Sequence, residues 1–206
     1  MHVMLDYETL GNTPCTTVVS LGLTCFNRSG ILDKKYFEFD LNHQIKSGRS
    51  VKASTLEWWM NQKDSARAVF KTEPNKPKIL LPTFFNEYES FVSKNLSEIG
   101  EKWDQVKPWG NGANFDVSIT EHLYHNHHEK GEFGIPWKFW NVMCFRTFAA
   151  ITGAKDLVKR QGVHHNALDD AVYQTECVLA VWNKKATKKS NDSIKNSRPG
   201  LRTRRT

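Results

Sequence analysis

The chain has 206 residues, of which 39% are hydrophobic and 12% aromatic, so it is long and apolar enough to form a globular domain with a buried core. No stretch approaches the roughly 20 apolar residues of a membrane-spanning helix, and no charged start followed by an apolar stretch indicates a signal peptide. The four cysteines form no Cys-x-x-Cys pair, which is typical of reduced thiols. These features exclude a membrane protein or a disulfide-rich secreted protein and favour a cytoplasmic one.

The net charge of +7 is concentrated at one end of the chain. Residues 184–206 hold nine of the 29 Lys and Arg residues and one of the 22 Asp and Glu residues, so residues 1–183 carry twenty basic against twenty-one acidic side chains. Residues 184–206 are also poor in large apolar side chains, a composition typical of disorder. We therefore expect a folded domain at 1–183 and a basic, disordered tail at 184–206. The tail could be a nucleic-acid-binding arm or a solubilising end.

The first predicted element is a buried strand in which Val3, Met4 and Leu5 lead into Asp6 and Glu8. Residues two apart on a strand point to the same face, so the two carboxylates should lie side by side at the strand end. Burying two like charges is costly unless a cation intervenes. Carboxylate oxygens are the ligands that Mg²⁺ and Mn²⁺ prefer, so this strand end is a candidate metal site.

Further strands and helices are predicted in the first half of the chain. Residues 16–26 and 36–39 are expected to be strands joined by short turns, which favours an antiparallel meander. A helix is expected to begin at an N-cap formed by Ser54 or Thr55. The other predictions are a helical turn at 64–70, a loop at 72–81 and an amphipathic helix with Pro82 in its first turn.

The second half alternates strands and helices. Residues 106–110 form a predicted strand that leads through a Gly- and Asn-rich turn into a helix from about Phe115. A strand at 139–144, a helix at 147–152 and a long amphipathic helix at 168–182, capped by Asn166, complete the pattern. This order predicts an α/β fold with a mixed central sheet and helices on its faces. Sites in such sheets form at the strand ends.

Three later residues could join Asp6 and Glu8. Asp116 follows a predicted strand and could be a metal ligand, or an aspartate that interacts favourably with the helix dipole. Asp170 lies one turn into the last helix, among small residues that allow this helix to pack close to the sheet. His165 precedes the helix in a loop, and a histidine suits a general base because it titrates near neutrality. It is also one of eight histidines, and an idle surface position is the alternative.

Three segments together resemble the motifs of the DEDD superfamily of 3′–5′ exonucleases, in its histidine-bearing (DEDDh) branch. They are Leu5-Asp6-Tyr7-Glu8-Thr9, Asn114-Phe115-Asp116 and His165-Asn166-Ala167-Leu168-Asp169-Asp170-Ala171. The last fits the pattern His-x-Ala-x-x-Asp-Ala, which selects His165 over His164 and Asp170 over Asp169. The segment Ser54 to Gln62, with Trp58 and Trp59, also resembles the phage exodeoxyribonuclease A type, and the actinobacterial exoribonuclease-like domain shares its general plan. The likeness spans roughly residues 2–183.

The resemblance implies an RNase H-like fold, with helices on both faces of the sheet, that removes nucleoside 5′-monophosphates from a 3′ end. It implies two Mg²⁺ or Mn²⁺ ions about 4 Å apart. Asp6 would bridge both ions, Glu8 and Asp170 would complete one, Asp116 would help hold the other, and His165 would act as general base. The expected partner is a nucleic acid with a free 3′ end, preferably single-stranded. The candidate substrate-binding residues are Thr9, Leu10, Trp58, Trp59, Asn114, Phe115 and Arg146.

Several alternatives stay open at this point. Trp58 and Trp59 are about 100° apart on a helix, so either one is in the core and the other lines the groove, or both are in the core. The substrate could be DNA or RNA, because no residue can be assigned to a contact with the 2′-hydroxyl. Besides an exonuclease that acts on DNA or on RNA, the protein could be a catalytically idle nucleic-acid-binding module. A zinc site formed by His122, His125, His127 and His128 has no standard ligand spacing to support it. The phage likeness suggests nucleotide salvage in a host cytoplasm.

Overall fold

The computed structural model describes residues 1–71 and 77–196, with side chains described through Lys184 except for those of residues 132 and 133. Within these residues the chain forms a five-stranded sheet in the order β3-β2-β1-β4-β5. The strands are β1 (His2–Thr9), β2 (Val18–Asn27), β3 (Gly30–Glu38), β4 (Lys107–Gly110) and β5 (Met143–Cys144). The first three strands pair antiparallel, whereas β4 pairs parallel with both β1 and β5. The predicted mixed sheet and its opening meander are confirmed.

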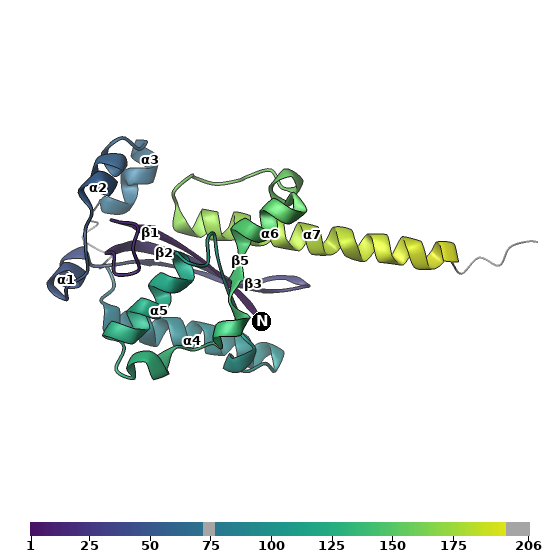
Figure 1. Cartoon of the computed structure of the whole chain (residues 1–206), viewed down its shortest axis with the longest axis horizontal. Helices are drawn as coiled ribbons and strands as arrows, with labels where there is room; N and C mark the ends of the chain where they lie inside the picture. Colours follow the sequence, from purple (N-terminus) through teal and green to yellow (C-terminus); the bar gives the residue numbers. More distant parts are fainter. Residues whose placement is uncertain (72–76, 197–206) are drawn as a thin grey trace, which may run out of the picture.

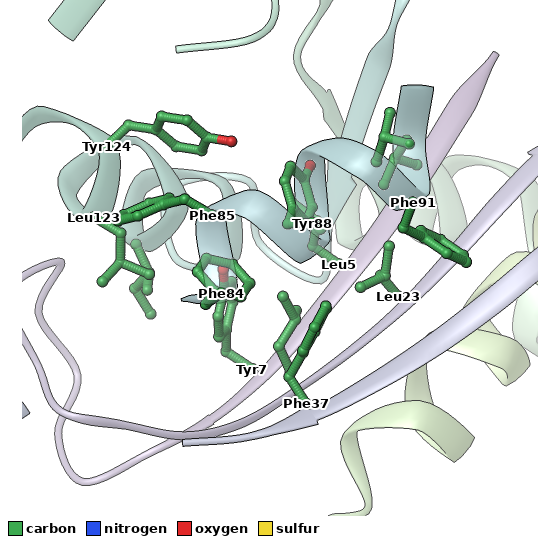
Figure 2. Packing of buried hydrophobic residues seen from close by; sticks show 14 of the residues in the cluster. Leu5, Tyr7, Leu23, Phe37, Phe84, Phe85, Tyr88, Phe91, Leu123 and Tyr124 are labelled. Carbon is green, nitrogen blue, oxygen red and sulfur yellow. The ribbon is translucent and has the colours of Figure 1, made fainter. Parts of the chain in front are cut away.

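Helices cover both faces of this sheet, as predicted. Helices α4 (Leu81–Ile99) and α5 (Asp116–His127) lie on one face, and α6 (Phe145–Thr152) and α7 (Ala167–Asn196) lie on the other (Figure 1). The apolar residues of α4 recur with the period of a helix and meet the sheet with Phe84, Tyr88 and Phe91 (Figure 2). Pro82 lies in the first turn of α4, as expected.

The alternation of side chains along β1 decides which face carries the acidic residues. Val3, Leu5 and Tyr7 belong to the cluster under α4 and α5, whereas Met4 belongs to the cluster under α6 and α7. Because side chains alternate along a strand, Asp6 and Glu8 share the face of Met4 and point toward α7. Both faces of the strand therefore have a packing partner, and its acidic residues are confined to its carboxyl-terminal half.

A glycine in β2 allows α7 to approach the sheet closely. Gly22 pairs with Asp6 across the ladder. A Cβ at this position would lie 2.2 Å from the backbone of Ala167, the first residue of α7. The start of α7 thus rests on the sheet at Gly22, which brings the first turn of the helix next to the end of β1.

Smaller helices extend the domain beside the end of β1. They are α1 (Leu41–Lys46), α2 (Ala53–Met60) and α3 (Asp64–Arg67). Short 3₁₀ helices occur at Ala68–Phe70, Trp103–Gln105, Gly131–Gly134, Phe139–Asn141 and Ala154–Leu157. A third apolar cluster joins Leu10 and Val19 to Trp59 of α2 and Ala66 of α3. This cluster fixes α2 against the carboxyl end of β1.

The structure differs from the sequence-based expectations in four places. The helix α1 was not expected. The N-cap of α2 is Lys52, without a side-chain bond, so the prediction of Ser54 or Thr55 as the cap is wrong. Only Met143–Cys144 is a strand in the predicted strand 139–144, because Phe139–Asn141 forms a 3₁₀ turn whose Phe139 and Trp140 side chains are 79% and 67% exposed.

The fourth difference concerns the tail. Helix α7 continues to Asn196, where disorder was expected from residue 184, and residues 197–206 lie outside the described part of the chain. The predicted loop at 72–81 is also partly outside it, at 72–76.

The four cysteines are free, as predicted. Across the described residues, every helix is too short or too polar to cross a membrane.

Candidate active site

A cleft of about 450 Å³ opens at the carboxyl ends of β1 and β4 and beside the start of α7. Each of the five predicted catalytic residues lines it: Asp6, Glu8, Asp116, His165 and Asp170. They come from four separate parts of the chain, namely β1, α5, the loop before α7, and α7 itself. The sheet topology therefore brings together residues up to 164 positions apart.

Three of the four predicted carboxylates form one compact group. Asp6, Glu8 and Asp170 each offer an oxygen, and these oxygens lie within 4.8 Å of one another. Asp6 and Glu8 share a face of β1, and Asp170 reaches them from the first turn of α7. The group is the one set of three potential metal ligands found among the described residues, and it has the oxygen chemistry that Mg²⁺ and Mn²⁺ prefer.

Asp116 lines the same cleft but stands outside this compact group. It is 3% exposed, and its Oδ1 accepts a hydrogen bond of 3.0 Å from the backbone N–H of Tyr7. A Cβ at Gly110 would lie 2.8 Å from the Asp116 Cβ, so the glycine at the end of β4 makes room for this side chain. The carboxylate is held against β1 by this hydrogen bond.

The electrostatics of the site favour cation binding. Burial, followed by repulsion from Asp116 and Glu8, raises the pKa of Asp6 well above its usual value. Burial and the Asp116 charge raise the pKa of Glu8 to about 8. Burial also raises the pKa of Asp116 to about 7, against the backbone hydrogen bonds from Tyr7 and Asn111 that lower it. A divalent cation would relieve the repulsion and stabilise the ionised carboxylates.

Two amide oxygens add to the fit of such a cation. Gln174 lies one helical turn after Asp170, and its Nε2 donates a hydrogen bond of 2.6 Å to Asp6 Oδ1. Among the described side chains, Gln174 Oε1 and Asn111 Oδ1 are buried acceptors without a hydrogen-bond partner, and both residues line the cleft. Unpartnered buried oxygens beside paired carboxylates suit a hydrated hard cation.

His165 lies at the rim of the acidic group, in the loop before α7. Its Nδ1 is 3.9 Å from Glu8 Oε1, and its backbone N–H donates a hydrogen bond of 3.1 Å to Asp170 Oδ2. Its ring packs edge-on against Trp58, with 4.9 Å between the ring centroids. Burial, with the charges of His164 and Arg160, lowers the pKa of His165. A neutral imidazole in this position can accept a proton at pH 7.

The loop that carries His165 is held by the start of α7. Asn166 Oδ1 accepts hydrogen bonds of 3.1 Å from the N–H groups of Leu168 and Asp169, which confirms Asn166 as the cap. Asp169 Oδ2 accepts a hydrogen bond of 2.8 Å from Val163 N–H, so this carboxylate anchors the loop. His165 has a φ of 63°, the one positive φ at a non-glycine residue in the described chain. Backbone strain of this kind is often found at functional sites.

The candidate substrate-binding residues divide into buried and accessible ones. Thr9, Leu10 and Trp59 are buried, and Trp59 Nε1 donates a hydrogen bond of 2.9 Å to the carbonyl of Thr9. Trp58 is 41% exposed. Of the two adjacent tryptophans, one is therefore in the core and the other is accessible beside His165.

The remaining candidates lie near the start of α5 and on α6. Phe115 and Arg146 line the cleft, and Arg146 Nη2 donates a hydrogen bond of 2.9 Å to the carbonyl of Asn111. Asn114 is exposed. The histidines of the alternative zinc site, His122, His125, His127 and His128, do not form a metal-ligand group within the described residues.

Sequence reasoning missed Arg160, Tyr173 and Asn111, which also line the cleft. The helical spacing of Tyr173 and Gln174 from Asp170 could have placed them near the site. Arg160 lies in irregular backbone before the last helix, where no periodicity predicts the direction of a side chain.

The sheet order, the helices on both faces and the acidic group at the end of β1 define an RNase H-like exonuclease fold. The solved structure of cell-death related nuclease 4 (CRN-4) has the same fold, with a TM-score of 0.52 and 11% sequence identity; the match covers 89% of this chain and 64% of that chain. An acidic cluster of this kind is consistent with the metal site typical of DEDD exonucleases.

Residues 1–182 match the 3′–5′ exoribonuclease Rv2179c-like domain, and the chain belongs to this family of 3′–5′ exonucleases. The chain is also 27% identical over 163 residues to the exodeoxyribonuclease of Enterobacteria phage T4, which covers 70% of this chain and 68% of the phage protein. The resemblance deduced from the three sequence motifs is confirmed.

Proposed function

We propose that this protein is a divalent-metal-dependent exonuclease that hydrolyses single-stranded nucleic acid from the 3′ end and releases nucleoside 5′-monophosphates. The observation that carries the proposal is the group of Asp6, Glu8 and Asp170 oxygens within 4.8 Å of one another, with His165 at its rim. Asp116, held by a hydrogen bond from the backbone N–H of Tyr7 and electrostatically coupled to Asp6, completes the acidic set.

In this proposal the four carboxylates bind Mg²⁺ or Mn²⁺. The bound ions supply positive charge to the scissile phosphate and lower the pKa of a nucleophilic water. Asp6 belongs to the compact group and also interacts electrostatically with Asp116, so it would help to hold bound metal together with the other three carboxylates. Gln174 keeps Asp6 oriented through its hydrogen bond.

His165 removes the proton from the attacking water. The water oxygen forms a bond to phosphorus, the bond from phosphorus to the 3′ oxygen of the preceding nucleotide breaks, and that oxygen takes a proton from solvent. The products are a nucleoside 5′-monophosphate and a chain shortened by one nucleotide with a free 3′-hydroxyl. The lowered pKa of His165 keeps its imidazole neutral before the step.

The accessible side chains around the cleft support a single-stranded substrate. Trp58 offers an exposed ring at the rim, and stacking on a base is worth roughly 1–3 kcal/mol. Phe115 and Arg146 line the cleft, where the guanidinium can bind a phosphate. The buried Thr9, Leu10 and Trp59 position the end of β1 and α2, because Trp59 Nε1 donates to the carbonyl of Thr9 and the Lys52 N–H donates to the carbonyl of Leu10.

DNA is the proposed substrate, and RNA is the second candidate. The phage relative is named an exodeoxyribonuclease, whereas the matching family is named for an exoribonuclease. These names describe related proteins and favour different sugars for this one. The same site can hydrolyse either backbone, because the leaving 3′ oxygen and the phosphate are common to both.

The test uses matched single-stranded DNA and RNA oligonucleotides with a 5′ label and the same base sequence. We expect a ladder shortened from the 3′ end in Mg²⁺ or Mn²⁺, release of nucleoside 5′-monophosphates, and no cleavage in EDTA. An oligonucleotide with a blocked 3′ end should resist cleavage. The ratio of the two rates assigns the sugar preference.

Asp116→Asn is the matched control variant, because it keeps the shape of the side chain and removes one charge from the acidic set. It should retain the thermal stability of the wild type and lose nearly all cleavage. If the wild-type protein binds the oligonucleotide but leaves it intact in every metal condition, the chain is instead a nucleic-acid-binding module.

A further inference from the structure

Arg160 occupies a position that the exonuclease scheme does not use. It lies in the loop between Leu157 and α7, and its Nη2 forms an ion pair with Asp170 Oδ1. Its Cζ lies 5.0 Å from the centroid of the Tyr173 ring. The side chain is 20% exposed. A guanidinium thus pairs with one carboxylate of the acidic group and lies over an aromatic ring.

The acidic group needs a counter-charge when no metal ion is bound. The positive side chains that line the cleft are Arg146, Lys155 and Arg160, and among them Arg160 forms an ion pair with a carboxylate of the compact group. Its charge also reaches Asp6, whose carboxylate it stabilises. The guanidinium therefore plays, in the metal-free protein, part of the electrostatic role of a cation.

The two oxygens of Asp170 have separate partners. Oδ2 accepts the backbone N–H of His165 at 3.1 Å, and Oδ1 faces Arg160. A divalent cation bound by Asp6, Glu8 and Asp170 would compete with Arg160 for Oδ1, because two cations on one oxygen repel each other. The bond to Oδ2 involves a neutral backbone group and can persist when Arg160 leaves.

We propose that Arg160 is an exchangeable counter-ion that leaves Asp170 when a divalent cation binds and then holds a phosphate of the nucleic acid. This proposal rests on the proposed nuclease function. The Tyr173 ring provides a resting place inside the cleft for the released guanidinium. The Arg160 Nε is buried and has no hydrogen-bond partner among the described residues, so the side chain has one unused donor, and its planar fork suits a phosphate.

The first test is calorimetric titration of the intact protein with Mn²⁺ alone. Arg160→Gln removes the competitor, and we expect the affinity for Mn²⁺ to rise about tenfold. Lys155→Gln is the matched control, because it removes the same charge from the same cleft, where the Lys155 Nζ lies over the Phe145 ring and not at Asp170. Its affinity should rise by no more than about twofold. Equal increases in the two variants would show a general charge effect and overturn the exchange.

The second test separates the two states of Arg160. In EDTA, Arg160→Gln should melt at a lower temperature than the wild type, since Asp170 loses its counter-charge. In saturating Mn²⁺ the difference should disappear. A difference that persists unchanged in Mn²⁺ would assign Arg160 a purely structural role and contradict the proposal.

Kinetics in saturating Mn²⁺ test the phosphate contact. Arg160→Gln should raise KM for a single-stranded oligonucleotide about tenfold, with a smaller change in kcat, because the guanidinium binds substrate and does not transfer the proton. An unchanged KM would overturn the second half of the proposal. Because the titration and the melting curves need no cleavage, a wild type that binds Mn²⁺ but cuts no nucleic acid would refute the proposed function and leave the metal exchange intact.

Discussion

The two histidines before α7 differ in their surroundings, although they are adjacent in sequence. His165 has its Nδ1 3.9 Å from Glu8 and its backbone N–H bonded to Asp170. His164 is exposed at the rim of the same cleft. A proton acceptor must reach the nucleophilic water beside the carboxylates, so His165 has the better placement.

We predict that His165→Ala lowers kcat by about 10²–10⁴-fold, the usual effect of removing a general base. Mn²⁺ affinity should stay within a few fold, because the carboxylates remain in place. His164→Ala serves as the control and should keep most of the activity. Single-turnover rates, combined with filter binding of single-stranded substrate, measure both effects. If His164→Ala is the inactive variant, the assignment of the motif to His165 is wrong.

At the scale of elements, the contact between β2 and α7 decides whether the acidic group can assemble. Asp170 is carried by α7, and the helix can approach Asp6 because Gly22 has no side chain at the contact. A methyl group there would meet backbone atoms, which cannot rotate away as a flexible side chain can. Packing at this one residue therefore controls the geometry of the site.

Gly22→Ala should destabilise the protein by about 1–3 kcal/mol, as overpacking of a tight contact does, and should lower both Mn²⁺ affinity and kcat by moving Asp170. Ser20→Ala is the stability control, since it lies on the same face of the same strand and adds no atoms. Urea denaturation measures the free energy of unfolding of each variant. An alanine at position 22 that leaves stability and metal binding unchanged would show that α7 is not seated on the sheet as described.

At the scale of the whole molecule, the N-terminal end of the sheet contains a histidine with an altered titration. His2 lies among the rings of Phe26, Trp109 and Trp182, and its Nδ1 accepts a hydrogen bond of 2.8 Å from Trp109 Nε1. Burial, with the positive charges of Lys107, the amino terminus and Arg28, lowers the pKa of His2 to about 4. Protonation of the His2 Nδ1 would charge the ring and remove the acceptor of the hydrogen bond from Trp109.

Because the ordinary pKa of histidine is about 6.5, the unfolded chain binds more protons at His2 than the folded protein does between pH 4 and 6.5. Stability from this group is therefore present above pH 6.5 and is lost as the pH falls toward 4. His2→Gln keeps an acceptor for Trp109 and removes the titration, so the fall in melting temperature over this range should be shallower. The melting temperature of each protein is plotted against pH relative to its own value at pH 8, which removes the effect of the substitution on stability itself. Parallel curves for the wild type and His2→Gln would refute the prediction.

We propose that the exonuclease domain ends at residue 183 and that the basic residues after it, although α7 continues to Asn196, are not needed for folding. Val181 and Trp182 are the last side chains of α7 in the described core, so deleting residues 184–206 should change the melting temperature little. The deletion removes nine basic residues, and binding of single-stranded nucleic acid should weaken and depend less on salt. A tail of the same length with Gln at these positions is the control. Equal salt slopes for all three proteins would make the tail a solubilising end.

Sequence by itself determined those features that depend on neighbours along the chain. The alternation in β1 places Asp6 and Glu8 on one face, Asn166 caps α7 through bonds two and three residues away, and the spacing of the last motif selects His165 and Asp170. These are local regularities of strands, helix starts and motifs, so they could be predicted together with the class of fold. The same local rules failed at residues 139–141, where an apolar pattern suggested a buried strand and the aromatic side chains are exposed.

Tertiary structure alone decided which distant residues meet. The order of the strands places Asp116 beside Tyr7, the missing side chain of Gly22 seats α7 on the sheet, and the third apolar cluster buries Trp59 while Trp58 stays accessible. Arg160 reaches Asp170 through the path of an irregular loop. None of these contacts has a local signal, because each depends on the packing of segments far apart in sequence, and such packing is set by shape, burial and charge in the folded chain.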